Sequence, residues 1–273
     1  RGQKLRGSAV KEYAVENQLN LLQPSNLKDP EFISELASLN ADLFIVVAFR
    51  MLPAVVFEMP PKGTINLHGS LLPQYRGAAP INWAIINGET ETGASTFFIE
   101  QKIDTGEIID NVKVTIEPNT TAGELHDALM HSGSTLLLDT VNSIENGTNS
   151  STPQDNSKEL KKAFKIFKDT CEINWKLEIQ SIHNLIRGLS PYPASWTDIN
   201  IDGQELTAKV FKSEIADLET ESKTGTYTDH KNYLEFRKGK KALRILEIQI
   251  AGKKRMDIKS LLNGYKNANI QLK

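Results

Sequence analysis

Apolar residues between positions 42 and 116 fall into short runs whose lengths and periods predict the strands of a sheet. The run Asp42–Phe49 is almost continuously apolar, which is typical of a parallel strand buried on both faces. Thr64–His68 alternates between polar and apolar residues, so Asn66 and His68 share the face opposite to the apolar side chains. Two further strands are expected over Ala94–Glu100 and Ile108–Ile116.

Capping signals and helical periodicity predict four helices between residues 8 and 146. Ser8 is a suitable N-cap for a helix that continues to Leu19. Thr121 and Glu124 form a capping-box pattern at the start of a helix that runs to about Asn146. The other two helices are expected over Pro30–Leu39, with Phe32, Ile33, Leu36 and Ala37 buried, and from Pro80 through Ile86.

The pattern changes after residues 148–160, which are rich in Gly, Ser, Thr, Asn and Pro and are expected to link two domains. We therefore expect residues 1–147 to form an α/β domain and residues 161–273 to form a separate second domain. Lys158–Lys168 is basic and amphipathic, and we expect it to form a helix that bridges the two. Short strands after a helix at Ile179–Gly188 indicate a small β-barrel. They are expected over Ser195–Ile201, Leu206–Ser213, Gly225–Thr228, Tyr233–Lys238 and Ala242–Ala251.

The two halves of the chain carry opposite formal charges, although the net charge of the whole is only −2. Residues 1–157 hold 10 Lys and Arg against 19 Asp and Glu, a formal charge of −9. Residues 158–273 hold 22 against 15, a formal charge of +7. A basic half on an acidic chain indicates an anionic partner for that half, although solvated surface lysines explain the same count.

An amide, an imidazole and a carboxylate stand out as candidate chemistry. Asn66 and His68 lie at the end of a strand that stops at Gly69, and ligands of open α/β sheets bind at strand ends. Asp104 follows the next strand, far enough along the chain for a helix and a strand to return to the same end. Because no Ser or Cys nucleophile lies nearby, the set indicates proton transfer and oxyanion stabilisation instead of covalent catalysis.

The string NLHGSLLPQYRGAAPI at positions 66–81, followed by the loop at Asp104 and Gly106, resembles the folate-dependent formyltransferase family. Ser190–Trp196, with the sequence SPYPASW, extends the resemblance into the second half. The resemblance implies an α/β fold, with a Rossmann-like formyltransferase domain followed by an OB-like β-barrel domain. It also implies that Asn66, His68 and Asp104 are catalytic, in an enzyme that moves the formyl group of 10-formyltetrahydrofolate to the α-amino group of methionyl-tRNA.

The resemblance further implies two sets of binding residues. Folate is expected to contact two loops, through Phe49, Met51, Leu52, Ser70, Leu71, Leu72 and Pro73. Arg50 departs from the family, in which a glycine is commoner after the aromatic residue. The initiator methionyl-tRNA is expected to contact basic residues near both ends of the chain, namely Arg1, Lys4, Arg6, Lys253, Lys254 and Arg255.

The family's sheet starts with a strand, a helix and a second strand that come before the first residue of this sequence. We therefore expect a preceding βαβ segment, or another chain, to complete the sheet around Asp42–Phe49. Three other functions stay open at this stage. They are a sugar-nucleotide formyltransferase, a glycinamide ribonucleotide formyltransferase and an inactive remnant that binds folate or tRNA; the basic second domain and the SPYPASW segment favour the tRNA enzyme over the first two.

The remaining sequence features bear on the compartment, the cofactors and the partners of the protein. Cys171 is the only cysteine, so no internal disulfide can form and a reducing cytoplasm is expected, with bacterial-type or organellar translation. The sequence has no apolar run of transmembrane length, no metal-binding motif and no phosphate-binding glycine loop. We therefore expect no metal and no membrane partner, and a protein that acts as a monomer.

Overall fold

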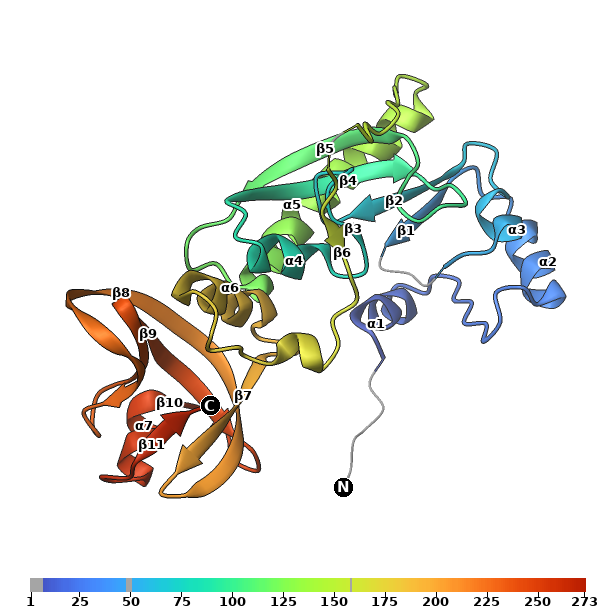
Figure 1. Cartoon of the computed structure of the whole chain (residues 1–273). Helices are drawn as coiled ribbons and strands as arrows, with labels where there is room; N and C mark the ends of the chain where they lie inside the picture. Colours follow the sequence, from blue (N-terminus) through green and yellow to red (C-terminus); the bar gives the residue numbers. More distant parts are fainter. Residues whose placement is uncertain (1–6, 48–50, 158) are drawn as a thin grey trace. The chain divides into compact units, whose positions relative to one another are not determined.

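The computed structural model describes residues 7–47, 51–157 and 159–273, and the chain divides into two compact units, Arg1–Ile65 and Asn66–Lys273 (Figure 1). The side chains of Ser8 and Asp29 cap two helices of the first unit by accepting hydrogen bonds from backbone amides, which confirms the helix start predicted at Ser8. The elements of this unit are α1 (Ala9–Glu16), α2 (Pro30–Ser38), β1 (Phe44–Val47), α3 (Ala54–Phe57) and the start of β2 (Thr64–His68).

The expectation that the strand near position 45 is buried on both faces is wrong for β1. Ile45 and Val47 are 47% and 55% exposed, whereas Phe44 and Val46 are half-buried. The sheet order is β1-β2-β4-β5, so among the residues that the structure describes β1 has one neighbouring strand, β2. Helix α2 also buries less than expected, because its apolar side is half-buried and Ala37 is exposed.

The α/β part of the second unit follows the predicted order closely. Pro80 occupies the first turn of α4, and the capping box between Thr121 and Glu124 begins α5. Strands β4 and β5 pair in antiparallel register, with Ala94 opposite Val112, and α5 packs against both of them. The elements are the rest of β2, then β3 (Arg76–Gly77), α4 (Pro80–Ile86), β4 (Glu91–Phe98), β5 (Ile108–Thr115) and α5 (Ala122–Glu145).

The C-terminal part is an antiparallel β half-barrel with the strand order β10-β9-β8-β7-β11. The four short strands predicted after position 206 are portions of two long strands, which keep pairing across bulges near Ser222 and Gly225. A continuous apolar core lies between the half-barrel and α6. The elements are α6 (Ile179–Leu189), β7 (Ser195–Ile201), β8 (Gln204–Thr228), β9 (Leu234–Ile250), β10 (Met256–Asp257), α7 (Ile258–Gly264) and β11 (Ile270–Leu272).

The basic segment before α6 is not the bridging helix that its amphipathic pattern predicts. Its strand β6 (Lys162–Ala163) pairs in parallel with β3, and a short 3₁₀ helix follows at Asp169–Cys171. The carbonyls of Lys161 and Ala163 accept hydrogen bonds from the amides of Tyr75 and Ala78. Backbone groups that a helix would satisfy locally are therefore satisfied by a segment more than 80 residues away.

Helix α6 joins the two parts of the second unit (Figure 1). One of its faces lies in the half-barrel core, and Asn82 of α4 donates a hydrogen bond of 2.7 Å to the carbonyl of Gly188. His183 is buried at this junction: Nε2 donates to the carbonyl of Pro118 over 3.3 Å, and Nδ1 accepts from the hydroxyl of Ser213 over 3.0 Å. Burial lowers the pKa of His183; the Pro118 carbonyl raises it and the charge of Arg187 lowers it, and burial prevails.

This buried imidazole makes stability depend on pH in one direction. Because the pKa of His183 is lower in the folded chain, the unfolded chain binds more protons as pH falls below about 6.5. The free energy of unfolding therefore falls as pH falls through that range, and the contribution of neutral His183 to stability is fully present above it. We expect His183→Gln to reduce this pH dependence between pH 7.5 and 5.5, by at most about 1.4 kcal/mol per pH unit. Urea unfolding measures the effect, with His131→Gln on an exposed face of α5 as the control. Equal slopes for wild type and His183→Gln would contradict it.

No helix within the described ranges is both long enough and apolar enough to cross a membrane.

Candidate active site

Strand β2 places an amide and an imidazole side by side in the interior of the second unit. Asn66 and His68 point to the same face of the strand because they are two residues apart, and they are 4% and 7% exposed. Solvent-side positions near a strand end are expected for His68 and Asp104 from the sequence, but their side chains are buried, so that expectation is wrong. The chain after Gly69 folds back over the strand end, and the ring of Phe97 packs edge-on against His68 with centroids 6.5 Å apart.

Hydrogen bonding assigns different roles to the two nitrogens of His68. Nε2 lies 2.9 Å from the carbonyl oxygen of Tyr75, which can only accept, so Nε2 carries a proton. Nδ1 lies 3.8 Å from Oδ2 of Asp104, close enough for charge attraction but too far for a direct hydrogen bond. Nδ1 is therefore the nitrogen that can take up and release a proton, and it faces the carboxylate.

Asp104 is held in a strained and tightly packed loop. Its φ of 55° lies in the left-handed region, and it is 9% exposed. The backbone amide of Gly77 donates to Oδ2 over 2.9 Å. At Gly106 the loop passes so close to the end of β4 that only glycine fits, because a Cβ on residue 106 would lie 1.7 Å from the carbonyl oxygen of Phe98. The loop thus fixes the carboxylate beside His68.

The carbonyl of Tyr75 orients His68, and the side chain of Tyr75 is in turn held by a network of hydrogen bonds. The phenol of Tyr75 donates to the carboxylate of Glu89 over 2.5 Å, and the ammonium of Lys161 binds the same carboxylate. Burial and the Glu89 bond raise the pKa of Tyr75. Burial alone would raise the pKa of Glu89, but the bonds from Lys161 and Tyr75 hold it below its usual value. The phenol stays neutral and the carboxylate charged, so this network fixes the Tyr75 main chain at neutral pH.

Gln154 is a site residue that reasoning from sequence missed. Its side-chain nitrogen donates to the carbonyls of Asp104 and Gly106 over 2.9 and 2.7 Å. Its side-chain oxygen accepts from Arg76, over 2.9 Å from Nε. The neighbouring Thr152 exchanges two backbone hydrogen bonds with Ile108, which secures this stretch to the start of β5. A segment whose composition indicates a linker therefore holds the carboxylate loop in place.

We expect Gln154→Ala to lower kcat by about 10²-fold, because a displacement of about 1 Å in a catalytic group costs that much. KM for either substrate should change little, since the side-chain hydrogen bonds of Gln154 go to the Asp104 loop and to Arg76, neither of which is assigned to substrate binding. Gln154→Glu should lose comparable activity, because a carboxylate cannot donate to the two carbonyls. Steady-state kinetics measures both variants, with the exposed Ser157→Ala as the control. Wild-type kcat in Gln154→Glu would show that these two hydrogen bonds do not position Asp104.

The predicted folate residues fall into both units. In the second unit, Ser70 is fully buried and donates to the carbonyl of Gln74 over 2.6 Å. Ser95 of β4 secures the loop by donating to the carbonyl of Ser70 over 2.8 Å and accepting from the amide of Leu72 over 3.1 Å. The side chains of Leu71 and Pro73 are partly exposed. This loop is therefore rigid and lies directly after the strand that carries Asn66 and His68.

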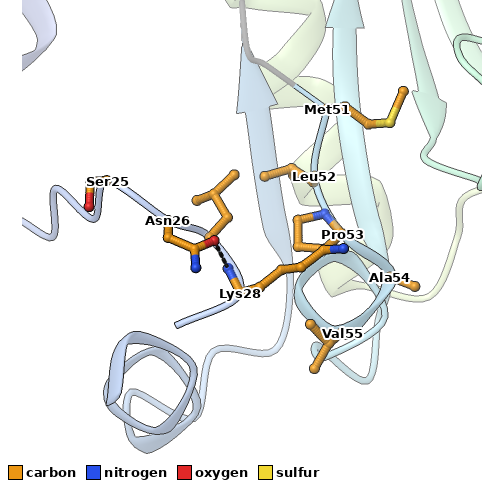
Figure 2. A pocket seen from close by; sticks show the side chains of 9 residues that line it. Ser25, Asn26, Lys28, Met51, Leu52, Pro53, Ala54 and Val55 are labelled. Atoms are coloured by element: carbon orange, nitrogen blue, oxygen red, sulfur yellow. Dashed lines mark hydrogen bonds between the residues drawn. The ribbon is translucent and has the colours of Figure 1, made fainter. Parts of the chain in front are cut away.

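In the first unit, a pocket of about 520 Å³ includes Met51 and Leu52 in its wall (Figure 2). The opposite wall is the turn at residues 25–28, in which the side chain of Asn26 accepts from the amide of Lys28 over 3.0 Å. Met51 is largely exposed and Leu52 half-buried, so both present apolar surface. Phe49 and Arg50 lie outside the described residues.

The predicted tRNA contacts at the C-terminus lie on the exposed turn between β9 and β10. Lys253 donates to the hydroxyl of Tyr265 over 2.7 Å, and Arg255 pairs with Glu247 and stacks on a phenylalanine ring. Lys254 forms no ion pair with the described carboxylates. Arg1, Lys4 and Arg6 lie outside the described residues. Among the described residues, no group of three His, Cys, Asp or Glu could hold a metal ion.

The chain is similar to known proteins over both of its halves. The formyl transferase family model matches residues 1–141, and the model of the formyl transferase C-terminal domain matches residues 165–266. The chain is 52% identical to the methionyl-tRNA formyltransferase of Flavobacterium johnsoniae and 50% identical to that of Parabacteroides distasonis; each comparison covers 97% of this chain and 84% of the relative.

Solved structures show the same fold at lower identity. A sugar 3N-formyltransferase, WlaRD, crystallised with dTDP and 5-N-formyl-THF, superposes with a TM-score of 0.67 at 22% identity, over 90% of this chain and 82% of that one. The N-formyltransferase of Helicobacter canadensis gives a TM-score of 0.62 at 23% identity, over 89% and 82%. With family models that match both halves and relatives about half identical over nearly its whole length, the chain belongs to the formyl transferase family.

Proposed function

We propose that this protein transfers the formyl group of 10-formyltetrahydrofolate to the α-amino group of methionyl-tRNA. The relatives support the acceptor, because those with about 50% identity carry the name methionyl-tRNA formyltransferase. The observation that carries the chemistry is the buried set of Asn66, His68 and Asp104, which offers an amide donor and a proton-transfer pair. The protein is expected to act as a monomer in a cytoplasm that starts translation with formylmethionine.

Each residue of the set has a distinct task in this mechanism. The bound folate supplies an activated formyl group. Asn66 offers side-chain N–H donors to the negative charge that develops on the formyl oxygen, and one such donor is worth roughly 2.7–4 kcal/mol. Asp104 and Nδ1 of His68 accept the proton that the attacking amine loses and return one to the departing nitrogen. Burial of all three strengthens these interactions by excluding water.

The residues present suit a folate co-substrate. Ser70–Pro73 forms a fixed, partly apolar loop next to the catalytic strand, and it exposes the side chains of Leu71 and Pro73. Met51 and Leu52 supply further apolar surface in the first unit. A mostly apolar wall with a few fixed polar groups is what an aromatic ligand requires. We assign these two segments, together with Phe49, to the folate site.

The acceptor is tested by offering the purified protein 10-formyltetrahydrofolate with three amines in parallel. Methionyl-tRNA should give the highest kcat/KM by orders of magnitude. A dTDP-linked amino sugar and glycinamide ribonucleotide should be poor acceptors, although sugar formyltransferases share the fold. A higher kcat/KM for the amino sugar would overturn the proposal in favour of that class.

The basic C-terminal turn yields a prediction about tRNA affinity. We expect the double variant Lys253→Gln and Lys254→Gln to raise KM for methionyl-tRNA and to leave KM for the folate unchanged. The dependence of log affinity on log salt should become shallower by about 1 for each lost phosphate contact. Lys113→Gln, on exposed β5 of the acidic half, is the matched control. An unchanged salt slope would remove this turn from the tRNA interface.

A further inference from the structure

The segment Lys161–Lys168, with the sequence KKAFKIFK, combines features that neither the catalytic set nor the folate site explains. It holds four lysines and no acid within eight residues. Its two phenylalanines, Phe164 and Phe167, are 64% and 61% exposed. An exposed aromatic ring forgoes the stabilisation that burial of so large an apolar side chain brings. Two of them in one short segment indicate a surface that another molecule covers.

The main chain of this segment is fixed even though its rings are exposed. The indole of Trp83 donates to the carbonyl of Phe164 over 2.7 Å, and the indole of Trp196 donates to the carbonyl of Lys168 over 3.0 Å. Between them, the carbonyl of Phe167 accepts from the thiol of Cys171. The main chain that carries the rings is therefore already ordered when a ligand arrives, which lowers the entropic cost of binding.

The charges around the rings suit an anionic ligand that carries flat groups. The ammonium of Lys165 lies 5.6 Å from the centre of the Phe167 ring, and that of Lys168 lies 5.3 Å from the Trp196 ring. Within the described part of the chain, neither of these lysines nor Lys162 pairs with a carboxylate. Aromatic rings interleaved with cations are the means by which proteins bind unpaired nucleotides, because bases stack while phosphates meet the positive charge.

The segment also lies next to the catalytic loop. Ala163 pairs with Gly77, and the amide of Gly77 donates to the carboxylate of Asp104. Phe164 follows directly, so it lies within roughly 15 Å of that carboxylate, given the usual spacing of paired strands and successive residues. A ligand stacked on Phe164 is thus a few nucleotides away from the reaction centre.

We propose that Phe164 and Phe167 form a stacking platform for the unpaired 3′-terminal nucleotides of the aminoacyl-tRNA acceptor, with Lys162, Lys165 and Lys168 neutralising their phosphates. This inference rests on the proposed function for its choice of RNA. The platform holds the nucleotides that precede the aminoacylated end, so the amine reaches Asn66, His68 and Asp104 from a fixed direction.

The test compares binding of methionyl-tRNA and of the same tRNA trimmed of its unpaired 3′ nucleotides. The wild-type protein should bind the intact tRNA at least about 10-fold more tightly, since each stacked base contributes about that much. The double variant Phe164→Ala and Phe167→Ala should lose this preference. Phe164→Leu with Phe167→Leu should lose most of it too, because leucine keeps apolar area but has no π face. Leu138→Ala, at an exposed apolar position on α5, should keep it.

Three results would overturn the platform. They are an equal loss of affinity for intact and trimmed tRNA in the alanine variant, wild-type preference in the leucine variant, and self-association of the wild-type protein that the alanine variant abolishes. The last would make the surface a contact between copies of this chain. Because binding is measured without formyl transfer, a protein that shows the 3′-end preference but does not formylate methionyl-tRNA supports the platform and refutes only the proposed function.

Discussion

Asp104→Asn is expected to lower kcat for formyl transfer by about 10²–10⁴-fold, the range for a positioned acid–base group. Asparagine has nearly the same shape, and its oxygen can still accept the amide hydrogen of Gly77, so the loop should keep its conformation. What the variant removes is the negative charge 3.8 Å from Nδ1 of His68 and the ability to accept a proton. The loss should therefore appear in kcat, with KM for folate and for methionyl-tRNA nearly unchanged.

A neighbouring carboxylate provides the control for this variant. Asp110 lies on the same β4–β5 hairpin, is exposed and has no contact with His68 among the interactions described. Asp110→Asn should keep wild-type kinetics. If Asp104→Asn retained kcat within a factor of three or so while Asp110→Asn did the same, the carboxylate at 104 would have no part in proton transfer.

Gly106→Ala should be nearly as damaging, although residue 106 takes no part in the chemistry. An added Cβ would lie 1.7 Å from the carbonyl oxygen of Phe98 and 2.9 Å from its carbon, so the loop or the end of β4 must move. Overpacking of this kind costs about 1–3 kcal/mol of stability. The movement separates Asp104 from His68 and from the carbonyl contacts of Gln154, so kcat should fall by about 10²-fold or more.

Gly264→Ala is the matched control, because a Cβ there meets no atom within 4 Å. Thermal unfolding and steady-state kinetics of both variants separate the two effects. Gly106→Ala should lower both Tm and kcat, whereas Gly264→Ala should change neither by much. A Gly106→Ala protein with wild-type kcat would mean that the loop tolerates displacement and that the position of Asp104 is not critical.

Local signals explain which parts of the fold could be predicted from sequence. The alternation of Thr64–His68 gave β2 with its observed bounds, Pro80 marked the first turn of α4, and the capping box at Thr121 marked the start of α5. Each of these features is decided by residues within a few positions of one another. The pairing of His68 with Asp104 was also expected, because two strand ends of one sheet come together.

Non-local contacts explain the failures. Gln154 reaches carbonyls about 50 positions earlier in the chain, and nothing in a Ser-, Asn- and Pro-rich stretch marks that one side chain as buried. The segment at Lys162 has the periodicity of a helix, yet its backbone pairs with Arg76 and Gly77. The two strands predicted over Leu206–Ser213 and Gly225–Thr228 are one strand, because β8 keeps pairing with β9 across bulges near Ser222. In each case tertiary contacts prevailed over a local preference.

The most direct measurement is the single-turnover rate of formyl transfer to methionyl-tRNA, at saturating concentrations of both substrates, for wild type, His68→Gln, Asp104→Asn and the double variant. If the imidazole and the carboxylate act as one proton-transfer pair, the double variant should be about as slow as Asp104→Asn alone, because residues that act as a unit are not additive. Wild type should form formylmethionyl-tRNA rapidly in the same assay. Multiplied losses in the double variant, or a wild-type protein that forms no formylmethionyl-tRNA, would contradict a catalytic pair at the end of β2.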